Sequence, residues 1–167
     1  METSSPATAA PVHRYRARCV WEGSTGVGYE AYSRAHRVDA PPAEGGLALS
    51  SDPAFRGDPT RWNPEQLLVM AAASCQLLSF LAVAARARVD VVAYADDAGA
   101  EMPERDRPVR ITSIRLRPLV TLVRGQADET RMRQLVDLAH RECYIANSLK
   151  TEITVEPTFR WVEAKAK

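Results

Sequence analysis

The feature that most constrains the fold is an apolar, alanine-rich stretch at residues 62–85, which opens with an Asn-Pro-Glu tripeptide. Asn63 can cap a helix, because its side-chain oxygen can accept an N–H group of the first turn, and Pro64 suits the first helical position. Glu65 favours the positive end of the helix dipole. The following residues are apolar on every face rather than along one stripe. The stretch therefore predicts a long helix, ending between residues 86 and 88, that is buried on most sides.

The chain has 167 residues, a length that predicts one domain with a substantial core. Residues 1–12 are small and polar and lack the basic start and apolar core of a secretory signal. We expect a disordered lead-in there, followed by a single domain at residues 13–167. Without an export signal, a cytoplasmic location is expected, and the 3 cysteines then start as free thiols.

The charge balance gives no reason to expect a polyanionic or membrane partner. The formal net charge is +1, so neither nucleic acid nor an anionic membrane surface is favoured. The alanine-rich stretch is interrupted by Ser74, Gln76 and Ser79, and the mean hydropathy of the chain is −0.27. A soluble protein without a membrane span is therefore expected.

Hydrophobic periodicity outlines the remaining elements. Alternating residues indicate strands, and an amphipathic pattern after Gly125 indicates a second helix. Pro118 is expected at a sheet edge or a bulge, because proline cannot donate to a strand ladder. The expected order is a meander of strands at 13–21, 28–34 and 36–40, a loop at 47–61, the long helix, strands at 89–95 and 109–124, helices at 128–142 and 145–150, and a strand at 151–162. Strands and helices in this order predict the α+β class.

Two cysteines are associated with predicted helices and one with a strand. Cys75 lies in the long helix, and Cys143 precedes the short one, where a helix N-terminus favours a thiolate. Cys19 lies mid-strand and is expected to be a small buried hydrophobe. Cys75 and Cys143 either form a redox pair or are buried hydrophobes. A metal site of His140, Cys143 and Cys75 is a weaker alternative, since no Cys-x-x-Cys motif supports it.

Residues 63–68, with Cys75 following in alanine-rich sequence, resemble the core motif of the OsmC/Ohr family, the osmotically induced and organic-hydroperoxide-resistance proteins. Residues 143–150 and 151–153 resemble the second cysteine segment and closing strand of that family. The resemblance extends from about residue 13 to residue 161. It implies an OsmC-like α+β fold, with antiparallel sheets around a long buried central helix, and an intertwined homodimer.

The resemblance also implies a thiol peroxidase that protects against oxidative stress. Cys75 would attack an organic hydroperoxide and become a sulfenic acid, which Cys143 would resolve as a disulfide. An external dithiol, of the lipoyl type in some members, would then reduce the disulfide, without cofactor or metal. A guanidinium would favour the thiolate, and Glu65 would orient that guanidinium.

The resemblance leaves the choice of arginine open. In OsmC-type members this arginine precedes the central helix, which selects Arg56 first and Arg61 second. In Ohr-type members it comes from the N-terminal strands, where Arg34 or Arg37 stands. The alternative for Arg56 is a solvated loop arginine.

A straight helix separates two of these site residues. Ten residues of α-helix span about 15 Å and about 280° of rotation, so Glu65 and Cys75 cannot share one site on an unbroken helix. Either the helix is broken, or Glu65 serves the site of a second subunit. Because this helix is so apolar, we expect a two-fold dimer in which two such helices pack antiparallel.

The sequence departs from the family pattern after each site cysteine. Gln76 stands where many members carry an aromatic residue, and Tyr144 where many carry proline. We expect Gln76 to make the pocket more polar, and Tyr144 to affect how Cys143 reaches Cys75. The competing function is a non-catalytic module that binds a small apolar ligand. The pocket would be lined by Leu77, Leu78, Phe80 and Tyr144.

Overall fold

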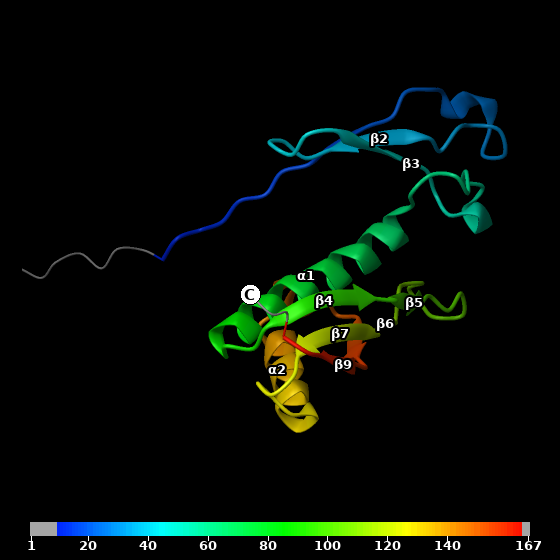
Figure 1. Ribbon diagram of the computed structural model, residues 1–167. Helices are drawn as coiled ribbons and strands as arrows, with labels where there is room; N and C mark the ends of the chain where they lie inside the picture. The colour runs from blue at the N-terminus through cyan, green and yellow to red at the C-terminus, as the bar shows by residue number, and fades with distance from the viewer. Residues whose placement is uncertain (1–9, 165–167) are drawn as a thin grey trace, which may run out of the picture. The chain divides into compact units, whose positions relative to one another are not determined.

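The computed structural model describes residues 10–164 of the chain (Figure 1). Of the predicted disordered lead-in, residues 1–9 lie outside the described residues, and residues 10–12 are exposed and without regular structure. The chain forms two compact units, Met1–Asn63 and Pro64–Lys167, each with its own strands. That residues 13–167 act as a single domain stays a prediction.

The first unit contains a three-stranded antiparallel sheet in the order β1-β2-β3. Its strands are β1 (Arg18–Val20), β2 (His36–Asp39) and β3 (Gly46–Leu49). An antiparallel meander is present, as predicted, and its strand at 36–40 is confirmed, whereas the strand predicted at 13–21 is limited to Arg18–Val20. The predicted strand at 28–34 is wrong, because residues 28–32 form turns, and the third strand lies at 46–49 instead. Cys19 is exposed on β1, contrary to the burial expected for it.

Two short 3-10 helices complete the first unit, η1 (Thr25–Val27) and η2 (Pro53–Phe55). The second lies in the segment at 47–61, which was predicted to be a loop; that prediction is wrong for residues 47–49, which belong to β3. Asp52 caps η2 by accepting the Ala54 N–H at 2.8 Å. A side chain at Gly57 would meet the Ser51 carbonyl oxygen, since a Cβ there would lie 1.5 Å from it. This close backbone approach requires glycine and fixes the path of the loop.

The second unit begins with α1 (Pro64–Arg86), the predicted long helix. Asn63 precedes its first residue, as predicted. The helix ends in a Schellman motif, in which the Val89 N–H donates to the Ala84 carbonyl and the Arg88 N–H to the Ala85 carbonyl, both at 3.0 Å. Arg88 occupies the left-handed position of this motif, with φ 60°.

Only one stripe of α1 is buried within the chain, rather than most of its sides. That stripe comprises Ala72, Gln76, Phe80, Val83 and Ala84. The opposite stripe is exposed and largely apolar, and it comprises Met70, Ser74, Leu78, Leu81, Ala82 and Ala85. Among the described residues, α1 is the one helix long and apolar enough to cross a membrane, a property that core helices of soluble proteins share.

Two mixed three-stranded sheets follow, in the orders β4-β7-β9 and β5-β6-β8. The prediction of antiparallel sheets is therefore correct only in part, because β6 pairs with β8, and β7 with β9, in parallel. The strands are β4 (Val91–Asp96), β5 (Gly99–Glu101), β6 (Ser113–Leu116), β7 (Pro118–Val123), β8 (Glu152–Val155) and β9 (Thr158–Val162).

Both long predicted strands are divided in the structure. The segment at 109–124 splits at Arg117 into β6 and β7, and the segment at 151–162 splits at residues 156–157 into β8 and β9. Pro118 is buried at the start of β7, the central strand of its sheet, so its expected edge position is wrong. The first residue of a strand is another position where proline is tolerated. The division lets one chain segment contribute to both sheets.

The two remaining helices are α2 (Glu129–Arg141) and α3 (Tyr144–Ser148), close to their predicted bounds. Asp128 caps α2, with its carboxylate accepting the Arg131 N–H at 2.7 Å. One core cluster joins α1, α2, β4 and β7 around Phe80, Val120 and Met132, each 0% exposed. Burying side chains of this size contributes about 1.5–3 kcal/mol each. This core fixes α1 against α2 and thereby positions the loop between α2 and α3.

Candidate functional site

The structure brings the two predicted site cysteines together at the start of α3. Cys75 lies on α1, and its sulfur accepts the Ile145 N–H at 3.5 Å. Cys143 is the N-cap of α3, and its sulfur accepts the Ala146 N–H at 3.5 Å. Both are free thiols. Adjacent peptide N–H groups of one helical turn thus point at both sulfur atoms, and the two thiols are close enough to interact directly.

The surroundings of the two thiols differ. Cys143 is 1% exposed, whereas Cys75 is partly exposed. Burial raises the pKa of the Cys143 thiol; the Ala146 N–H opposes this effect, and the neighbouring Cys75 adds to it. The expectation that the helix N-terminus would favour a Cys143 thiolate is therefore wrong, because desolvation outweighs the hydrogen bond. Cys143 is held as a protonated thiol at neutral pH.

A pocket of about 530 Å³ opens beside Cys75 within the second unit. Its lining consists of Cys75, Leu78, Ser79, Ala82, Arg86, Arg141, Glu142, Tyr144 and Asn147. Of the four residues expected around an apolar pocket, Leu78 and Tyr144 line it. Leu77 does not, and Phe80 is fully buried in the core. The pocket gives a small organic molecule access to the Cys75 sulfur.

One side of this pocket carries charged groups that sequence patterns did not single out. Arg86, at the end of α1, donates to the Glu142 carboxylate at 2.5 Å. Asn147 donates to the Arg141 carbonyl oxygen at 2.9 Å, which links α3 to the end of α2. Arg86 and Glu142 are 56 residues apart in sequence, so no local pattern could have paired them.

Gln76 faces away from the pocket. It is 1% exposed, and its amide nitrogen lies 3.5 Å from the Val136 carbonyl oxygen in α2. The expectation that Gln76 would make the pocket more polar is therefore wrong. Cys75 and Gln76 are consecutive, so they lie on different faces of α1, and only Cys75 faces the pocket.

Glu65 stands in the first turn of α1, and its Oε2 atom is buried without a hydrogen-bond partner among residues 10–164. The helix is continuous from Pro64 to Arg86. Glu65 and Cys75 are thus about 15 Å apart along the axis, and the alternative of a broken helix is excluded. A carboxylate oxygen that is buried and unpaired favours a cationic partner outside the described contacts.

Three of the four candidate arginines line one pocket of the first unit, of about 350 Å³: Arg34, Arg56 and Arg61. Arg37 is not among its lining residues. Arg56 holds the left-handed position after η2, with φ 67°, and forms an ion pair with Glu30. Its side chain remains 48% exposed. The structure selects none of the four candidates, so the choice of arginine stays a prediction.

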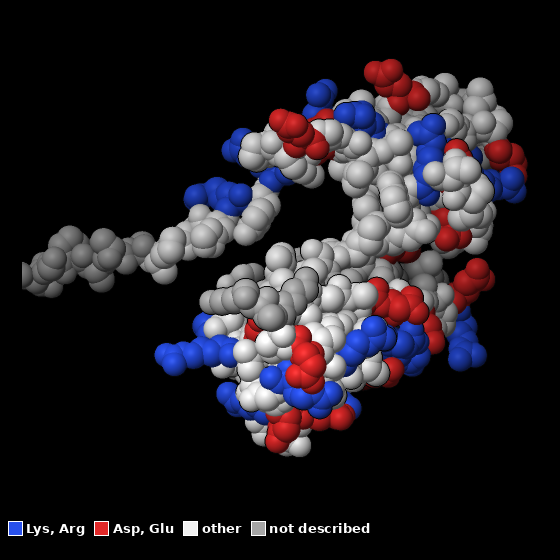
Figure 2. Space-filling model, in the orientation of Figure 1, with Lys and Arg blue, Asp and Glu red and all other residues white. Residues whose placement is uncertain are grey.

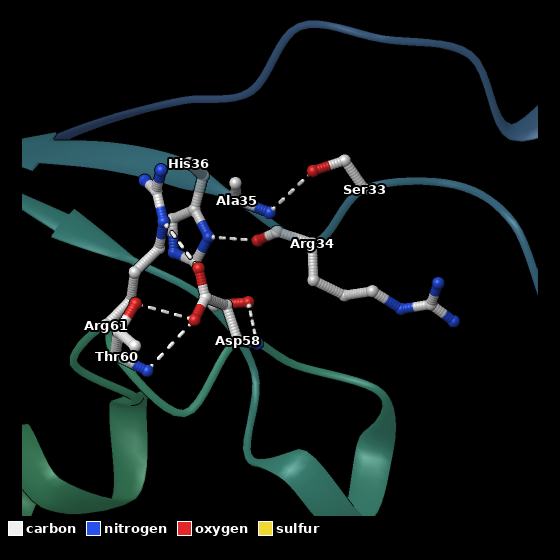
Figure 3. Close-up of polar contacts among 8 residues, drawn as sticks. Ser33, Arg34, Ala35, His36, Asp58, Thr60 and Arg61 are labelled. Carbon is white, nitrogen blue, oxygen red and sulfur yellow. Dashed lines mark hydrogen bonds and ion pairs between the residues drawn. The ribbon is translucent and has the colours of Figure 1, made fainter.

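Figure 3 shows how Arg61 and Arg34 differ. Arg61 lies against Asp58, with Nε 3.3 Å from its carboxylate, and Thr60 also donates to Asp58 (Figure 3). Hydrogen bonds from Thr60 and the charge of Arg61 lower the pKa of Asp58. The Arg34 side chain extends away from this cluster (Figure 3) and stacks on Tyr32, 3.7 Å from the ring centre. Arg34 and Arg61 are thus engaged locally.

The alternative metal site gains no support from the geometry. Within residues 10–164, no three His, Cys, Asp or Glu side chains gather in a way that could hold a metal ion. The His140 Nδ1 atom is buried without a hydrogen-bond partner in that range.

On the face seen in Figure 2, basic and acidic side chains are interspersed, in keeping with the net charge of +1.

The fold and the paired thiols define a class of small α+β proteins with a two-cysteine site at a helix junction. The family model described as OsmC-like protein matches residues 57–158, which is more than half of the chain. The chain belongs to the OsmC-like family. The match spans both cysteines and Glu65, as well as Arg61, whereas Arg56 lies just outside it.

Solved structures agree with this assignment. An OsmC-like protein of unknown function from Vibrio cholerae is 27% identical, with a TM-score of 0.78, over 88% of this chain and 100% of that one. The organic hydroperoxide resistance protein OsmC from Legionella pneumophila is 17% identical, with a TM-score of 0.65, over 90% and 99%. One from Elizabethkingia anophelis is 15% identical, with a TM-score of 0.68, over 91% and 99%. The last two show a shared fold alone. No curated protein matches the chain.

Proposed function

We propose that the chain is a thiol peroxidase that reduces organic hydroperoxides to alcohols. The observation that carries this proposal is the placement of Cys75 and Cys143 at one helix end, with Cys75 facing a 530 Å³ pocket and Cys143 buried behind it. Two relatives in fold bear the name organic hydroperoxide resistance protein. Pockets of 300–1,000 Å³ suit small organic molecules.

The reaction follows from the two thiol environments. The Cys75 thiolate attacks the outer oxygen of the hydroperoxide, the O–O bond breaks, and the alkoxide takes up a proton and leaves as the alcohol. Cys75 is now a sulfenic acid. The Cys143 sulfur then attacks the Cys75 sulfur, and the sulfenic oxygen leaves as water. An external dithiol reduces the resulting disulfide, becomes a disulfide itself and regenerates both thiols.

The buried Cys143 suits the resolving role. Its raised pKa keeps it protonated and unreactive toward peroxide, so the attacking thiol is the one that faces the pocket. The Ile145 N–H that donates to the Cys75 sulfur stabilises negative charge there. Further stabilisation by a guanidinium is proposed to come from Arg56, with Arg61 second, because both precede the central helix, as the arginine of OsmC-type members does.

The site is proposed to be completed by a homodimer. The exposed apolar stripe of α1 is a surface that a second α1 would cover, and Glu65 cannot reach Cys75 along its own continuous helix. In this arrangement Glu65 of one chain orients the arginine that serves Cys75 of the other. A cytoplasmic location and a lipoyl-type dithiol as reductant belong to the same proposal.

Turnover of cumene hydroperoxide with excess dithiol tests the proposal. Cys75→Ser should abolish turnover, and Cys143→Ser should consume about one equivalent of peroxide and then stop or slow strongly. Cys19→Ser is the matched control, because Cys19 is exposed on β1 of the other unit, and it should retain the wild-type rate. Equal peroxide consumption by wild type and Cys75→Ser would reject the enzyme.

The size of the pocket favours one second candidate, a non-catalytic module that binds a small ligand beside Cys75. This candidate predicts binding of an organic molecule without oxidation of either thiol. Titration calorimetry with cumyl alcohol, which has the shape of the peroxide but no O–O bond, separates the two. Binding of the alcohol by a protein that leaves the peroxide intact would favour the module.

A further inference from the structure

We infer that Arg141 is a specificity residue that binds a carboxylate on the hydroperoxide substrate, so that the pocket prefers peroxides carrying an acid group. This inference rests on the proposed peroxidase function and names the substrate class of the same pocket. It arises from the distribution of charge around the pocket.

The pocket carries two guanidinium groups and one carboxylate. The carboxylate, Glu142, is engaged by Arg86 at 2.5 Å, so these two charges offset each other. Arg141 stands on the last turn of α2 and lines the same pocket, and among residues 10–164 its guanidinium has no hydrogen bond or ion pair. Other arginines of α2 are engaged: Arg133 with Glu129, and Arg131 with Gln134. Arg141 therefore leaves one uncompensated positive charge at the pocket.

The backbone of Arg141 is fixed even though its side chain is free. The Asn147 amide donates to the Arg141 carbonyl oxygen at 2.9 Å, and the end of α2 is held to α1 by the Arg86–Glu142 pair. The backbone of Arg141 is therefore held in place, while its long side chain can reorient toward a ligand. A guanidinium offers two parallel donors to a carboxylate, a geometry that lysine cannot reproduce.

The rest of the pocket is apolar near Cys75. Leu78, Ala82 and the exposed Tyr144 ring provide hydrocarbon surface beside the sulfur. An amphiphilic ligand fits this arrangement, with its carboxylate on Arg141, its hydrocarbon body on Leu78 and Tyr144, and its peroxide at Cys75. The uncompensated charge of Arg141 also raises the rate at which anionic ligands encounter the pocket at low salt.

A matched pair of probes tests this preference: 4-(2-hydroperoxypropan-2-yl)benzoate and its methyl ester, which differ in charge at one end. The measured quantity is the ratio of their second-order rate constants for Cys75 oxidation, in wild type, Arg141→Gln and Arg141→Lys. We expect a wild-type ratio of about ten in favour of the carboxylate, as one charge-assisted pair would give. The ratio should fall to about one in Arg141→Gln and take an intermediate value in Arg141→Lys.

Arg131→Gln is the control, because it removes the same charge from the same helix outside the pocket lining. It should keep the wild-type ratio, and raising the salt concentration should lower the ratio in wild type. A wild-type ratio near one, or a ratio that persists in Arg141→Gln, would overturn the role of Arg141. Failure of the ester and of cumene hydroperoxide to oxidise Cys75 would instead overturn the peroxidase function.

Discussion

At the residue scale, the direction in which each side chain points decides its role. Cys75 and Gln76 are neighbours, yet one lines the pocket and the other is 1% exposed in the core. The family resemblance singled out both cysteines, and the helical pattern predicted the elements that carry or adjoin them. The sequence did not identify the orientation of Gln76, because that depends on how α2 packs on α1.

Because Gln76 packs in the core, we expect the volume of its side chain to matter more for stability than the hydrogen bonding of its amide. Its only described hydrogen bond is long, at 3.5 Å, and its amide oxygen has no partner among residues 10–164. Gln76→Met should therefore change the free energy of unfolding by less than about 1.5 kcal/mol. Gln76→Ala should lower it by about 2 kcal/mol or more, because a cavity remains. Urea denaturation measures both, and an equally large loss in both variants would show that the amide carries the stability.

Tyr94 predicts a pH dependence of stability. Burial, with a smaller contribution from Asp96, raises the pKa of the Tyr94 hydroxyl, which has no hydrogen-bond partner among residues 10–164. A raised pKa means that the folded state holds the proton more tightly than the unfolded state. The stabilisation that this hydroxyl contributes is fully present below its pKa in the unfolded state, about 10. It is lost as the pH rises from there through the higher pKa of the folded state.

Tyr94→Phe should accordingly raise the free energy of unfolding at pH 7 by about 1 kcal/mol, because it removes a buried unsatisfied hydroxyl. It should also make the loss of stability above about pH 10 shallower. Urea denaturation at pH 7 and pH 10.5 tests both statements. The raised pKa of Cys143 acts in the same direction, so part of the alkaline loss should remain. An unchanged alkaline slope in Tyr94→Phe would contradict this account.

At the scale of elements, the sequence predicts where the helices begin and end, but it does not predict which strands pair. The Asn-Pro-Glu start of α1 and the Asp128 cap of α2 are local signals, and both helices lie close to their predicted bounds. The short strand β5 (Gly99–Glu101) was missed, because Gly99 and Ala100 have low strand propensity. Periodicity does not reveal which strands pair, so the parallel β6–β8 and β7–β9 ladders were not anticipated.

The C-terminal end of α1 offers a stability test. Arg88 has φ 60° at the position of the Schellman motif where glycine is usual. Arg88→Gly should raise the free energy of unfolding by about 0.5–1 kcal/mol, because it relieves the left-handed strain. Ala85→Gly, three residues earlier within the exposed helical face, should lower it by about 1 kcal/mol. Thermal unfolding with both variants tests the motif, and a destabilised Arg88→Gly would contradict it.

At the scale of the whole molecule, the sequence identified the family, whereas it leaves the choice of arginine open. Arg34, Arg56 and Arg61 line a pocket of the first unit, whereas the cysteines lie in the second. The spacing of these arginines along the chain does not indicate which of them serves the thiols. The burial expected for α1 was wrong for the single chain, because its apolar composition does not distinguish a core from an interface.

The proposed dimer predicts a mass of about twice 18.4 kDa in sedimentation velocity. Met70, 40% exposed on α1 and outside the lining of the pocket beside Cys75, would lie in the interface, so Met70→Asp should shift the protein toward the monomer. Val109→Asp is the control, since Val109 is also exposed but lies outside α1. A monomeric wild type, or a dimer that tolerates Met70→Asp as well as Val109→Asp, would contradict the proposed interface.

The central claim is that Cys75 and Cys143 act as a peroxide-dependent pair. Intact mass spectrometry and peptide mapping after one equivalent of cumene hydroperoxide test it most directly, with hydrogen peroxide in parallel. The account predicts rapid loss of two hydrogen atoms, mapped to a Cys75–Cys143 disulfide and faster with the organic peroxide. A stable sulfenic or sulfinic acid on Cys75, or no reaction at either thiol, would contradict it.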